Sequence, residues 1–233
     1  IGDKVSVKNG FGRNFLLKQG KALRFNKENQ DLVNKKKDEL NKKNNEIKSK
    51  FKEIAKLVDK KTGYIVLNKF NQKAFVETKN AIQKLKAEGA TQLILDLRGN
   101  PGGLLRESIR IVNLFVPKGE VIVTTKSKIK KYNKVYKTTE QPLDTEIPLA
   151  VIVNGRSASA SEIVSGALQD LDRAVIIGAR SFGKGLVQRP KNLSYGTQLK
   201  VTISRYYTPS GRCIQALDYT KRDEKGNALR NNE

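Results

Sequence analysis

Between residues 59 and 214, apolar residues recur with two spacings that alternate along the chain. Short runs of consecutive or alternating apolar residues predict strands, and apolar residues at helical spacing predict amphipathic helices. Because strands and helices alternate, we expect an α/β unit in which much of the strand pairing is parallel. The predicted strands are 63–67, 92–97, 120–124, 149–153, 174–177 and 198–206, and the predicted helices are 74–87, 104–115 and 161–171.

The first 58 residues follow a different pattern. Val5-Ser-Val7 alternates as a strand does, and Asn9-Gly10 after it is a turn signal. Residues 26–58 contain neither Gly nor Pro, which predicts one long helix with its N-cap near Asn26. Apolar residues recur there at every seventh position, but lysines hold most of the companion positions that a coiled coil needs to be apolar. We therefore favour a solvated connector helix, held in part by Glu-to-Lys pairs, over a partner-binding helix.

The composition narrows the chemistry that this chain of 233 residues can carry. It has no His, so Ser-His-Asp catalysis, Cys-His catalysis and His-ligated zinc are excluded, and its single Cys excludes an internal disulfide. We expect neither a metal nor another cofactor. No apolar run approaches 18 residues, so no transmembrane segment is predicted. The 46 Lys and Arg residues against 23 Asp and Glu give a net charge of +23, which favours anionic partners such as nucleic acid or an acidic membrane.

Two loops that follow apolar strands carry residues suited to an oxyanion or a nucleophile. In residues 96–104, glycines allow positive φ angles and let a backbone N–H face a ligand, although a tight strand–helix turn explains them equally well. In residues 154–163, a serine at a strand–helix junction has its hydroxyl near the positive end of the helix dipole. The alternative is that one of these serines is only a helix N-cap, followed by a favourable Glu162, and composition alone favours this alternative. The serines concerned are Ser157, Ser159 and Ser161.

A third loop, residues 181–188, favours a catalytic serine over a serine that is only a helix N-cap. Lys184 lies there between two glycines, after an apolar strand, where we expect it to be partly buried. Loss of water disfavours the ammonium, so such a lysine can lose its proton at modest pH and act as a general base. With no His available, a Ser–Lys pair is the activated nucleophile that this chain can still form, and Gln188 could hold the lysine amine in line. A surface cation or a phosphate-binding lysine is the alternative, but the loop lacks the Walker spacing.

Four motifs in this part of the chain stand in the order that they have in one enzyme family. They are residues 95–105 (LDLRGNPGGLL), 157–163 (SASASEI), 181–188 (SFGKGLVQ) and 205–212 (RYYTPSGR). On these motifs, the stretch from about Lys60 to Gln215 resembles the carboxyl-terminal processing peptidases, also called tail-specific proteases. Lys184 lies 25 residues after Ser159, as the base of that family's dyad lies after its nucleophile. The resemblance implies an α/β core related to the crotonase and Clp-protease folds, built of β-β-α units, and a peptide or protein substrate.

The same resemblance implies a set of site residues and shows one departure. Ser159 would be the nucleophile, Lys184 the general base and Gln188 the partner that orients this base. The backbone N–H groups of Gly103 and Ala160 would form the oxyanion hole. The family normally carries a peptide-binding PDZ domain before this stretch, and nothing resembling it stands there, so we expect a core without that domain.

Residues 1–58 resemble another family, on the motif GDKVSVKNGFGRNFLLKQGKA and the long charged helix after it. They look like the amino-terminal domain of bacterial large-subunit ribosomal protein nine, without its first strand. This resemblance implies a small, truncated α+β module that binds ribosomal RNA, mostly through phosphate contacts. The alternative is that its apolar residues form only a small core inside a solvated basic surface. The implied RNA contacts are Lys8, Arg13, Asn14, Lys18 and Lys21.

Together these patterns predict four parts: a basic ribosomal-protein-like module at 1–25, a connector helix at 26–58, a Ser/Lys peptidase core at 59–215 and a mobile charged tail at 216–233. The favoured function is a serine endopeptidase joined to a segment like an rRNA-binding domain. The alternatives are a ribosomal large-subunit protein whose peptidase-like half is inert, and a basic scaffold that binds any polyanion. The peptidase half suggests a periplasmic or membrane-associated location, whereas the ribosomal half suggests the cytoplasm. The chain begins at Ile1 without a signal peptide, so we expect a fragment or a processed product.

Overall fold

The computed structural model describes residues 17, 23, 25–36, 38–39, 55–59, 61–224 and 226–230. The chain divides into two compact units, Ile1–Glu53 and Ile54–Glu233. In the first unit, residues 27–36 and 38–39 are helical. The Oδ1 atom of Asn26 accepts a hydrogen bond of 2.9 Å from the N–H of Asn29, so Asn26 caps this helix as its sequence predicts.

The second unit begins with a strand where the sequence predicts the end of a long helix. Strand β1 (Ala55–Leu57) pairs antiparallel with β2 (Thr62–Val66), so the prediction of one helix through residue 58 is wrong at its end. Asp59 provides the physical reason. Its Oδ1 atom accepts hydrogen bonds from the N–H groups of Lys61 (2.7 Å) and Thr62 (2.6 Å), and such local side-chain bonds favour a turn over a helix.

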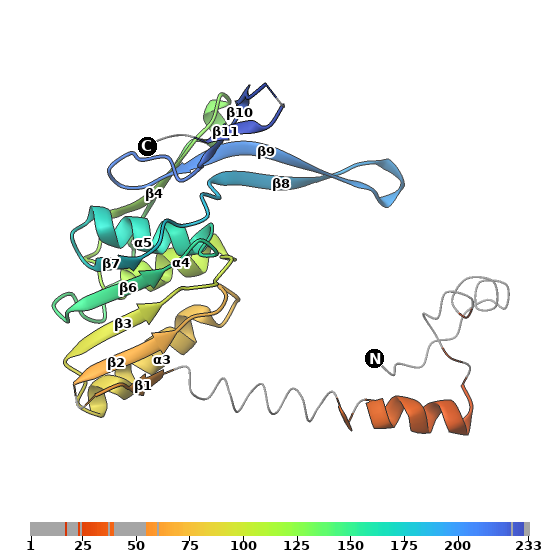
Figure 1. Cartoon of the computed structure of the whole chain (residues 1–233), viewed down its shortest axis with the longest axis horizontal. Helices are drawn as coiled ribbons and strands as arrows, with labels where there is room; N and C mark the ends of the chain where they lie inside the picture. Colours follow the sequence, from red (N-terminus) through yellow and green to blue (C-terminus); the bar gives the residue numbers. More distant parts are fainter. Residues whose placement is uncertain are drawn as a thin grey trace. The chain divides into compact units, whose positions relative to one another are not determined.

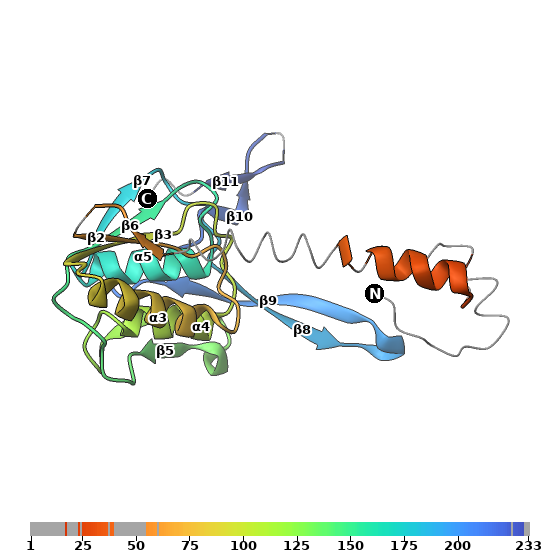
Figure 2. The same ribbon diagram turned by 90° about the horizontal axis from the view of Figure 1, so that it is seen from below.

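The larger sheet confirms the predicted alternation of strands and helices. In the described part of the chain it has five strands, in the order β1-β2-β3-β6-β7, and every pair after β1–β2 is parallel. Helices α3 (Ala74–Ala87), α4 (Leu105–Asn113) and α5 (Ala160–Asp170) cover one face of this sheet (Figures 1 and 2). The remaining strands of the sheet are β3 (Gln92–Asp96), β6 (Leu149–Val153) and β7 (Val175–Gly178).

The core lies between this sheet and the helices. Ile65, Leu93, Leu95 and Val151 each expose 2 % of their surface or less, and they occupy alternate positions of their strands. Because successive side chains of a strand point to opposite faces, these residues form one apolar layer against the helices. The helices contribute Ile82, Leu85, Ile111, Val112 and Leu168 to the same core.

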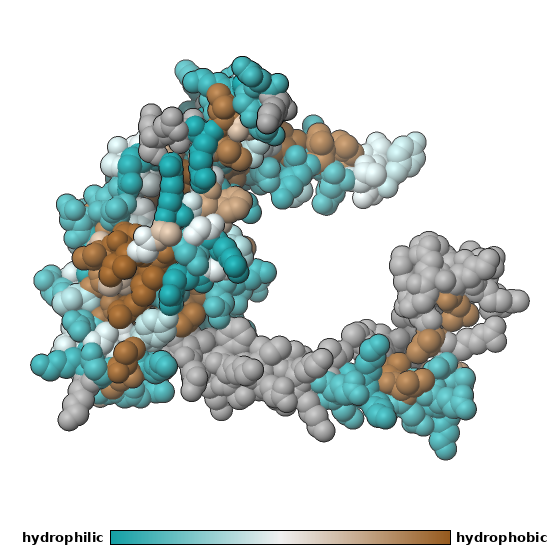
Figure 3. All heavy atoms as spheres, in the orientation of Figure 1, coloured by the Kyte–Doolittle hydropathy of each residue, from teal (hydrophilic) through white to brown (hydrophobic). Residues whose placement is uncertain are grey.

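The opposite face of the sheet carries apolar side chains that remain partly or largely exposed. Ala150 and Ile152 of β6 lie opposite Val175 and Ile177 of β7, and the last two expose 66 % and 51 %. Figure 3 shows apolar side chains gathered over these strands, and in the described residues no helix covers them (Figure 2). The residues that carry the candidate chemistry lie elsewhere, in the loops that follow the carboxyl ends of β3 and β6 and in the segment that leads from β7 into β8.

A second, antiparallel sheet has the strand order β5-β4-β9-β8 in the described residues. Ile122 and Val123 of β4 are fully buried in the core, whereas the side chains of residues 188–202 in the β8–β9 hairpin are exposed. The hairpin extends away from the rest of this unit (Figure 1). The strands are β4 (Val121–Lys126), β5 (Lys134–Lys137), β8 (Leu186–Asn192) and β9 (Gln198–Tyr207), with the short 3-10 helices η2 (Lys130–Tyr132) and η3 (Ser194–Gly196) at the turns.

The charged segment at the end of the chain differs from the mobile tail that its composition predicts. Its described residues form a hairpin of β10 (Leu217–Arg222) and β11 (Ala228–Arg230). The carboxylate of Asp223 stabilises the turn, because its Oδ1 atom accepts a hydrogen bond of 2.7 Å from the N–H of Asn227. None of the helices described for this chain is long and apolar enough to cross a membrane.

Candidate active site

Ser159 occupies a strained turn between β6 and α5. It immediately precedes the first residue of the helix and has φ 55° and ψ −109°. A positive φ is uncommon for a residue with a side chain, and a sharp, strained strand-to-helix turn is one way to expose a serine hydroxyl for nucleophilic attack. Ser159 is also the N-cap residue of α5, so the structural alternative from the sequence describes its position correctly.

The three serines of this segment have different surroundings. The Oγ atom of Ser157 donates to the carbonyl oxygen of Leu97 (2.8 Å), and that of Ser161 donates to the carbonyl oxygen of Asn100 (3.0 Å). Both of these serines are fully buried, whereas Ser159 is only half-buried. Of the three candidates, Ser159 is therefore the one that a substrate can reach.

The carboxylate of Glu162 joins the turn of Ser159 to the loop of Lys184. Its Oε2 atom accepts hydrogen bonds from the N–H groups of Ser159 (2.7 Å) and Lys184 (2.8 Å). Its Oε1 atom accepts from the N–H of Gly183 (2.6 Å) and from the Oγ of Ser181 (2.7 Å). Glu162 is itself 95 % buried, because it exposes only 5 % of its surface. Two loops that are far apart in sequence thus share one buried acceptor.

The side chain of Lys184 lies differently from the prediction. It is exposed rather than partly buried, so the expectation of burial is wrong. Within the described residues, no hydrogen bond or ion pair joins its ammonium to Ser159 or to Gln188. Gln188 is also exposed, and its Nε2 atom donates to the Oγ1 of Thr202 at 3.4 Å. The structure therefore brings the backbones of the predicted pair together through Glu162 and leaves their side chains apart.

The two glycines beside Lys184 are needed for close packing. Gly183 has φ +87°, and a Cβ atom there would lie 2.1 Å from the Cβ of Ala216. A Cβ atom on Gly185 would lie 2.3 Å from the backbone nitrogen of Gln215. The N–H of Gly185 also donates to the Oε1 of Gln215 at 2.9 Å. The lysine loop is thus fixed between Glu162 on one side and the segment before β10 on the other.

The glycine loop after β3 lies directly against the turn of Ser159. A Cβ atom on Gly102, whose φ is +94°, would lie 2.9 Å from both the Cβ of Ser159 and the backbone nitrogen of Ala160. Asn100 is fully buried and shapes this loop, because its Oδ1 atom accepts from the N–H of Gly102 at 2.9 Å. Ala160 is the first residue of α5, so its N–H needs no partner within the helix. Gly102 precedes Gly103, so the loop that carries one predicted oxyanion donor packs against the residue that carries the other.

The buried carboxylate of Asp96 holds the start of this loop in place. Asp96, at the end of β3, exposes 4 % and binds the side chain of Arg98 through two oxygens, at 3.0 and 2.7 Å. The hydroxyl of Tyr64 donates to the same carboxylate. Burial alone raises the pKa of Asp96, but the hydrogen bonds from Arg98 and Tyr64 outweigh it and hold the pKa below its usual value. Burial and the neighbouring carboxylate raise the pKa of Tyr64.

Comparison with known proteins shows the family of this chain. The model of Peptidase family S41 matches residues 61–223, which is well over half of the chain. The chain belongs to peptidase family S41. The predicted resemblance of the second part, and its mixed α/β fold, are confirmed. Residues 1–33 of this S41 chain match the model of Ribosomal protein L9, N-terminal domain, which bears out the second resemblance for that segment.

Curated relatives of this S41 chain are named as processing proteases. The carboxyl-terminal-processing protease of Synechocystis sp. is 41% identical over 155 residues, which cover 66% of this chain and 36% of the relative. The carboxy-terminal-processing protease of Bartonella bacilliformis is 43% identical over 164 residues, covering 68% and 37%. A solved structure, the photosystem II D1 C-terminal processing protease, is 35% identical with a TM-score of 0.62, and the match covers 66% of this chain and 39% of that chain. The chain spans little more than a third of the length of these relatives.

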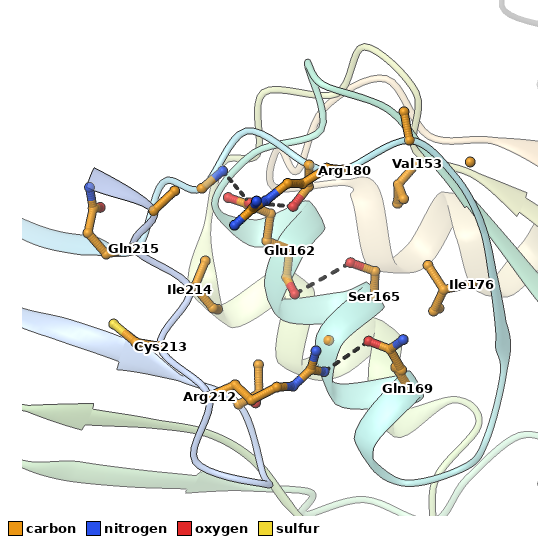
Figure 4. A pocket seen from close by; sticks show the side chains of 17 residues that line it. Val153, Glu162, Ser165, Gln169, Ile176, Arg180, Arg212, Cys213, Ile214 and Gln215 are labelled. Carbon is orange, nitrogen blue, oxygen red and sulfur yellow. Dashed lines mark hydrogen bonds between the residues drawn. The ribbon is translucent and has the colours of Figure 1, made fainter. Parts of the chain in front are cut away.

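A cavity of about 360 Å³ lies beside Glu162 in this S41 chain (Figure 4). Glu162, Ser165 and Gln169 of α5 line one side of it, and Arg212 and Gln215 line the other. Glu162 therefore borders a cavity large enough to hold water. Among the described residues, no group of three His, Cys, Asp or Glu side chains is placed to hold a metal ion.

The structure does not test the predicted RNA-binding residues. Lys8, Arg13, Asn14, Lys18 and Lys21 lie outside the described residues, and so do the apolar residues of the small core proposed as the alternative. Two residues that sequence reasoning missed are Glu162, considered only as a favourable first-turn residue, and Asn100. The sequence signal for Glu162 is that it is a polar residue inside a run of small and apolar residues.

Proposed function

We propose that this chain is a serine endopeptidase of the carboxyl-terminal processing type, in which Ser159 is the nucleophile and Lys184 the general base. The observation that carries this proposal is the buried carboxylate of Glu162, which accepts the backbone N–H groups of both residues. Family membership supports the reaction class. The exposure of Ser159, compared with its fully buried neighbours Ser157 and Ser161, supports the choice of nucleophile.

The mechanism follows from the roles of these groups. The amine of Lys184 takes the hydroxyl proton while the Oγ of Ser159 attacks the carbonyl carbon of the peptide bond. The N–H groups of Gly103 and Ala160 stabilise the negative oxygen of the tetrahedral intermediate. Lys184 then gives the proton to the leaving amine, and an acyl-enzyme remains on Ser159. Water, deprotonated by Lys184, attacks the acyl carbon. The bond from this carbon to the Oγ of Ser159 then breaks, Oγ takes the proton back from Lys184, and the acid is released.

Lys184 must change position for this step. Its exposed side chain has to turn toward Ser159, and Gln188 is the residue that we assign to orient it. A bound peptide would cover the lysine and exclude water from the reacting groups. The residues on the backbone side of the site need no such movement, because Glu162 already holds them.

The test is covalent labelling with a serine-reactive fluorophosphonate. We expect the wild-type chain to be labelled, and Ser159→Ala and Lys184→Ala to lose the label while they keep the wild-type circular dichroism spectrum. Ser194→Ala and Lys191→Ala, at exposed positions of the β8–β9 hairpin, are the matched controls and should be labelled normally. A folded wild type that takes no label, or a Ser159→Ala variant that is still labelled, would refute the proposed nucleophile.

A second function is favoured by a separate observation, the match of residues 1–33 to the ribosomal domain. We infer that this segment binds ribosomal RNA, with Arg13 and Lys18 among its phosphate contacts. Affinity for large-subunit ribosomal RNA, measured by filter binding, should then fall steeply as salt rises. Neutralising both residues in Arg13→Gln, Lys18→Gln should weaken binding and reduce the salt slope by about 2. Binding that ignores salt, or that the double variant leaves unchanged, would contradict this function.

A further inference from the structure

A second cavity, of about 600 Å³, lies beside Lys184. Lys184, Gln188 and the neighbouring Phe182 and Leu186 line the side that belongs to the proposed catalytic loop. The opposite side belongs to the β10–β11 hairpin. This cavity is large enough for a bulky side chain of a peptide, and such spaces near reactive groups are the usual place for ligand recognition. The hairpin residues that line it are Leu217, Tyr219 and Arg230.

The register of the hairpin explains why Leu217 and Arg230 face the same space. Leu217 is paired directly with Arg230, so their side chains share one face of the hairpin. Tyr219 lies at the irregularity of register that follows Asp218, and its side chain lines the same cavity. Asp218 points to the other face, where it lies 4.0 Å from the guanidinium of Arg205.

The hairpin is joined to the loop of Lys184 by one direct hydrogen bond and by two more that run through Gln215. The Nη2 atom of Arg230 donates to the carbonyl oxygen of Phe182 at 3.4 Å. The Nε2 atom of Gln215 donates to the carbonyl oxygen of Leu217 at 3.2 Å, while its Oε1 atom accepts from the N–H of Gly185 at 2.9 Å. Gln215 is almost fully buried, so the base of the hairpin has a defined position relative to Lys184.

The chemistry of the walls indicates what would fill the cavity. Phe182 and Tyr219 expose 57 % and 51 % of their surface, so two aromatic side chains offer apolar area that nothing in the described residues covers. The rim is cationic, because Arg180 and Arg230 line it together with Lys184, and no acidic residue is among the described residues that line it. Such a site favours a large neutral side chain and repels lysine and arginine.

We propose that this cavity is a substrate subsite which accepts one large apolar side chain of the peptide, and that the β10–β11 hairpin sets this selectivity. The inference rests on the proposed peptidase function and adds the substrate class to it. Tyr219 provides the aromatic wall, and Arg230 excludes basic side chains. Because Lys184 lines the same cavity, the side chain that fills it also covers the general base.

The experiment uses the full chain and fluorogenic peptides in which one position at a time, on either side of the cleaved bond, is Ala, Leu, Phe, Glu or Lys. We expect one position at which Leu or Phe is cleaved about tenfold or more faster than Ala, by kcat/KM, and Lys is cleaved slowest. Tyr219→Ala should reduce the preference for Phe at that position about tenfold, and Arg230→Gln should raise cleavage of the Lys peptide relative to the Leu peptide. Lys221→Gln, on the same strand and outside the cavity lining, is the control.

Fluorophosphonate labelling of Ser159 in each variant separates the two proposals. If all variants are labelled like the wild type, and Tyr219→Ala and Arg230→Gln keep the wild-type preferences, the subsite is refuted and the peptidase function stands. If the folded wild type takes no label and cleaves no peptide, the peptidase function fails and the subsite fails with it. If Tyr219→Ala unfolds, Arg230→Gln decides, because its exposed side chain makes a single hydrogen bond of 3.4 Å to the carbonyl oxygen of Phe182.

Discussion

Removal of the Glu162 carboxylate should loosen the nucleophile turn and the lysine loop at the same time. In Glu162→Ala, the N–H groups of Ser159, Gly183 and Lys184 lose their acceptor. Each buried donor left without an acceptor costs about 1–3 kcal/mol. Water from the adjacent cavity of about 360 Å³ can reach some of them, so we expect the lower end, about 3 kcal/mol in total. That loss corresponds to a fall in Tm of about 6–12 °C for a unit of this size.

The amide variant Glu162→Gln separates charge from shape. An amide has one acceptor oxygen, and it can keep the Oε2 contacts with Ser159 and Lys184 if its NH₂ group faces Ser181, whose hydroxyl can turn to accept. Only the N–H of Gly183 is then left without an acceptor, so this variant should lose about 1–3 kcal/mol. It should also keep more activity than Glu162→Ala.

The assay is the rate of fluorophosphonate labelling together with thermal unfolding. For Glu162→Ala we expect labelling to slow about 100-fold or more at a temperature where the variant is folded, because a small displacement of either loop separates nucleophile and base. Glu88→Ala is the matched control, since Glu88 forms an exposed ion pair with Lys84 at 3.6 Å and its loss should cost less than about 0.5 kcal/mol. Wild-type labelling and Tm in Glu162→Ala would refute the role of this carboxylate.

Three further substitutions test other parts of the site. Gly102→Ala would place a Cβ atom 2.9 Å from the Cβ of Ser159 at φ +94°, so labelling should fall about 100-fold. The control is Gly119→Ala, at φ +100° with no neighbouring atom within 4 Å. It should lower the free energy of unfolding by only about 1–2 kcal/mol and leave labelling intact. The pKa of Asp96 is below its unfolded value of 3.8, so Asp96 stabilises the fold above about pH 4, and this contribution is lost as the pH falls through the folded pKa. Urea unfolding at pH 7 and pH 3 should therefore show a smaller loss in Asp96→Asn than in the wild type, and an equal loss would contradict the assignment. Ser157→Ala should lower stability by about 1–3 kcal/mol and leave labelling of the folded protein unchanged, while the opposite result would make Ser157 the reactive serine.

The elements that the sequence predicts well are those with a local apolar pattern. Helix α3 and strand β6 have the predicted bounds, 74–87 and 149–153, because α3 buries one apolar face and β6 is an uninterrupted run of apolar residues. Strand β8 has no such pattern, since Arg189-Pro190-Lys191-Asn192 is exposed and is held only by pairing with β9. The β10–β11 hairpin was missed for the same reason: its pairing depends on a partner strand rather than on burial.

The same distinction applies to the candidate site: features with a local sequence pattern are predicted, and features that depend on distant contacts are not. The positions of Ser159 and of the glycine loop after β3 follow from strand–loop–helix patterns that are visible in the sequence. The role of Glu162 depends on contacts with residues 19 to 22 positions away, and that of Asn100 on a hydrogen bond of 2.6 Å to the carbonyl of Leu67, 33 positions away. No local pattern encodes such contacts. The burial of Lys184 was inferred from its two glycines, which in fact serve the close approach of residues 214–216.

The backbone of the proposed site is therefore held in place by hydrogen bonds, whereas the side chain of Lys184 still has to turn toward Ser159. Glu162, Asn100 and Gln215 hold the backbone of the site through hydrogen bonds among described segments of one unit. The side chain of Lys184, the proposed base, is exposed, so it is the part of the site that still needs cover from solvent. If the cavity lined by Phe182 and Tyr219 is the subsite proposed above, the substrate itself supplies that cover. A phosphonate probe that carries a phenylalanine side chain should then label Ser159 faster than a small alkyl probe does, and Tyr219→Ala should remove this advantage.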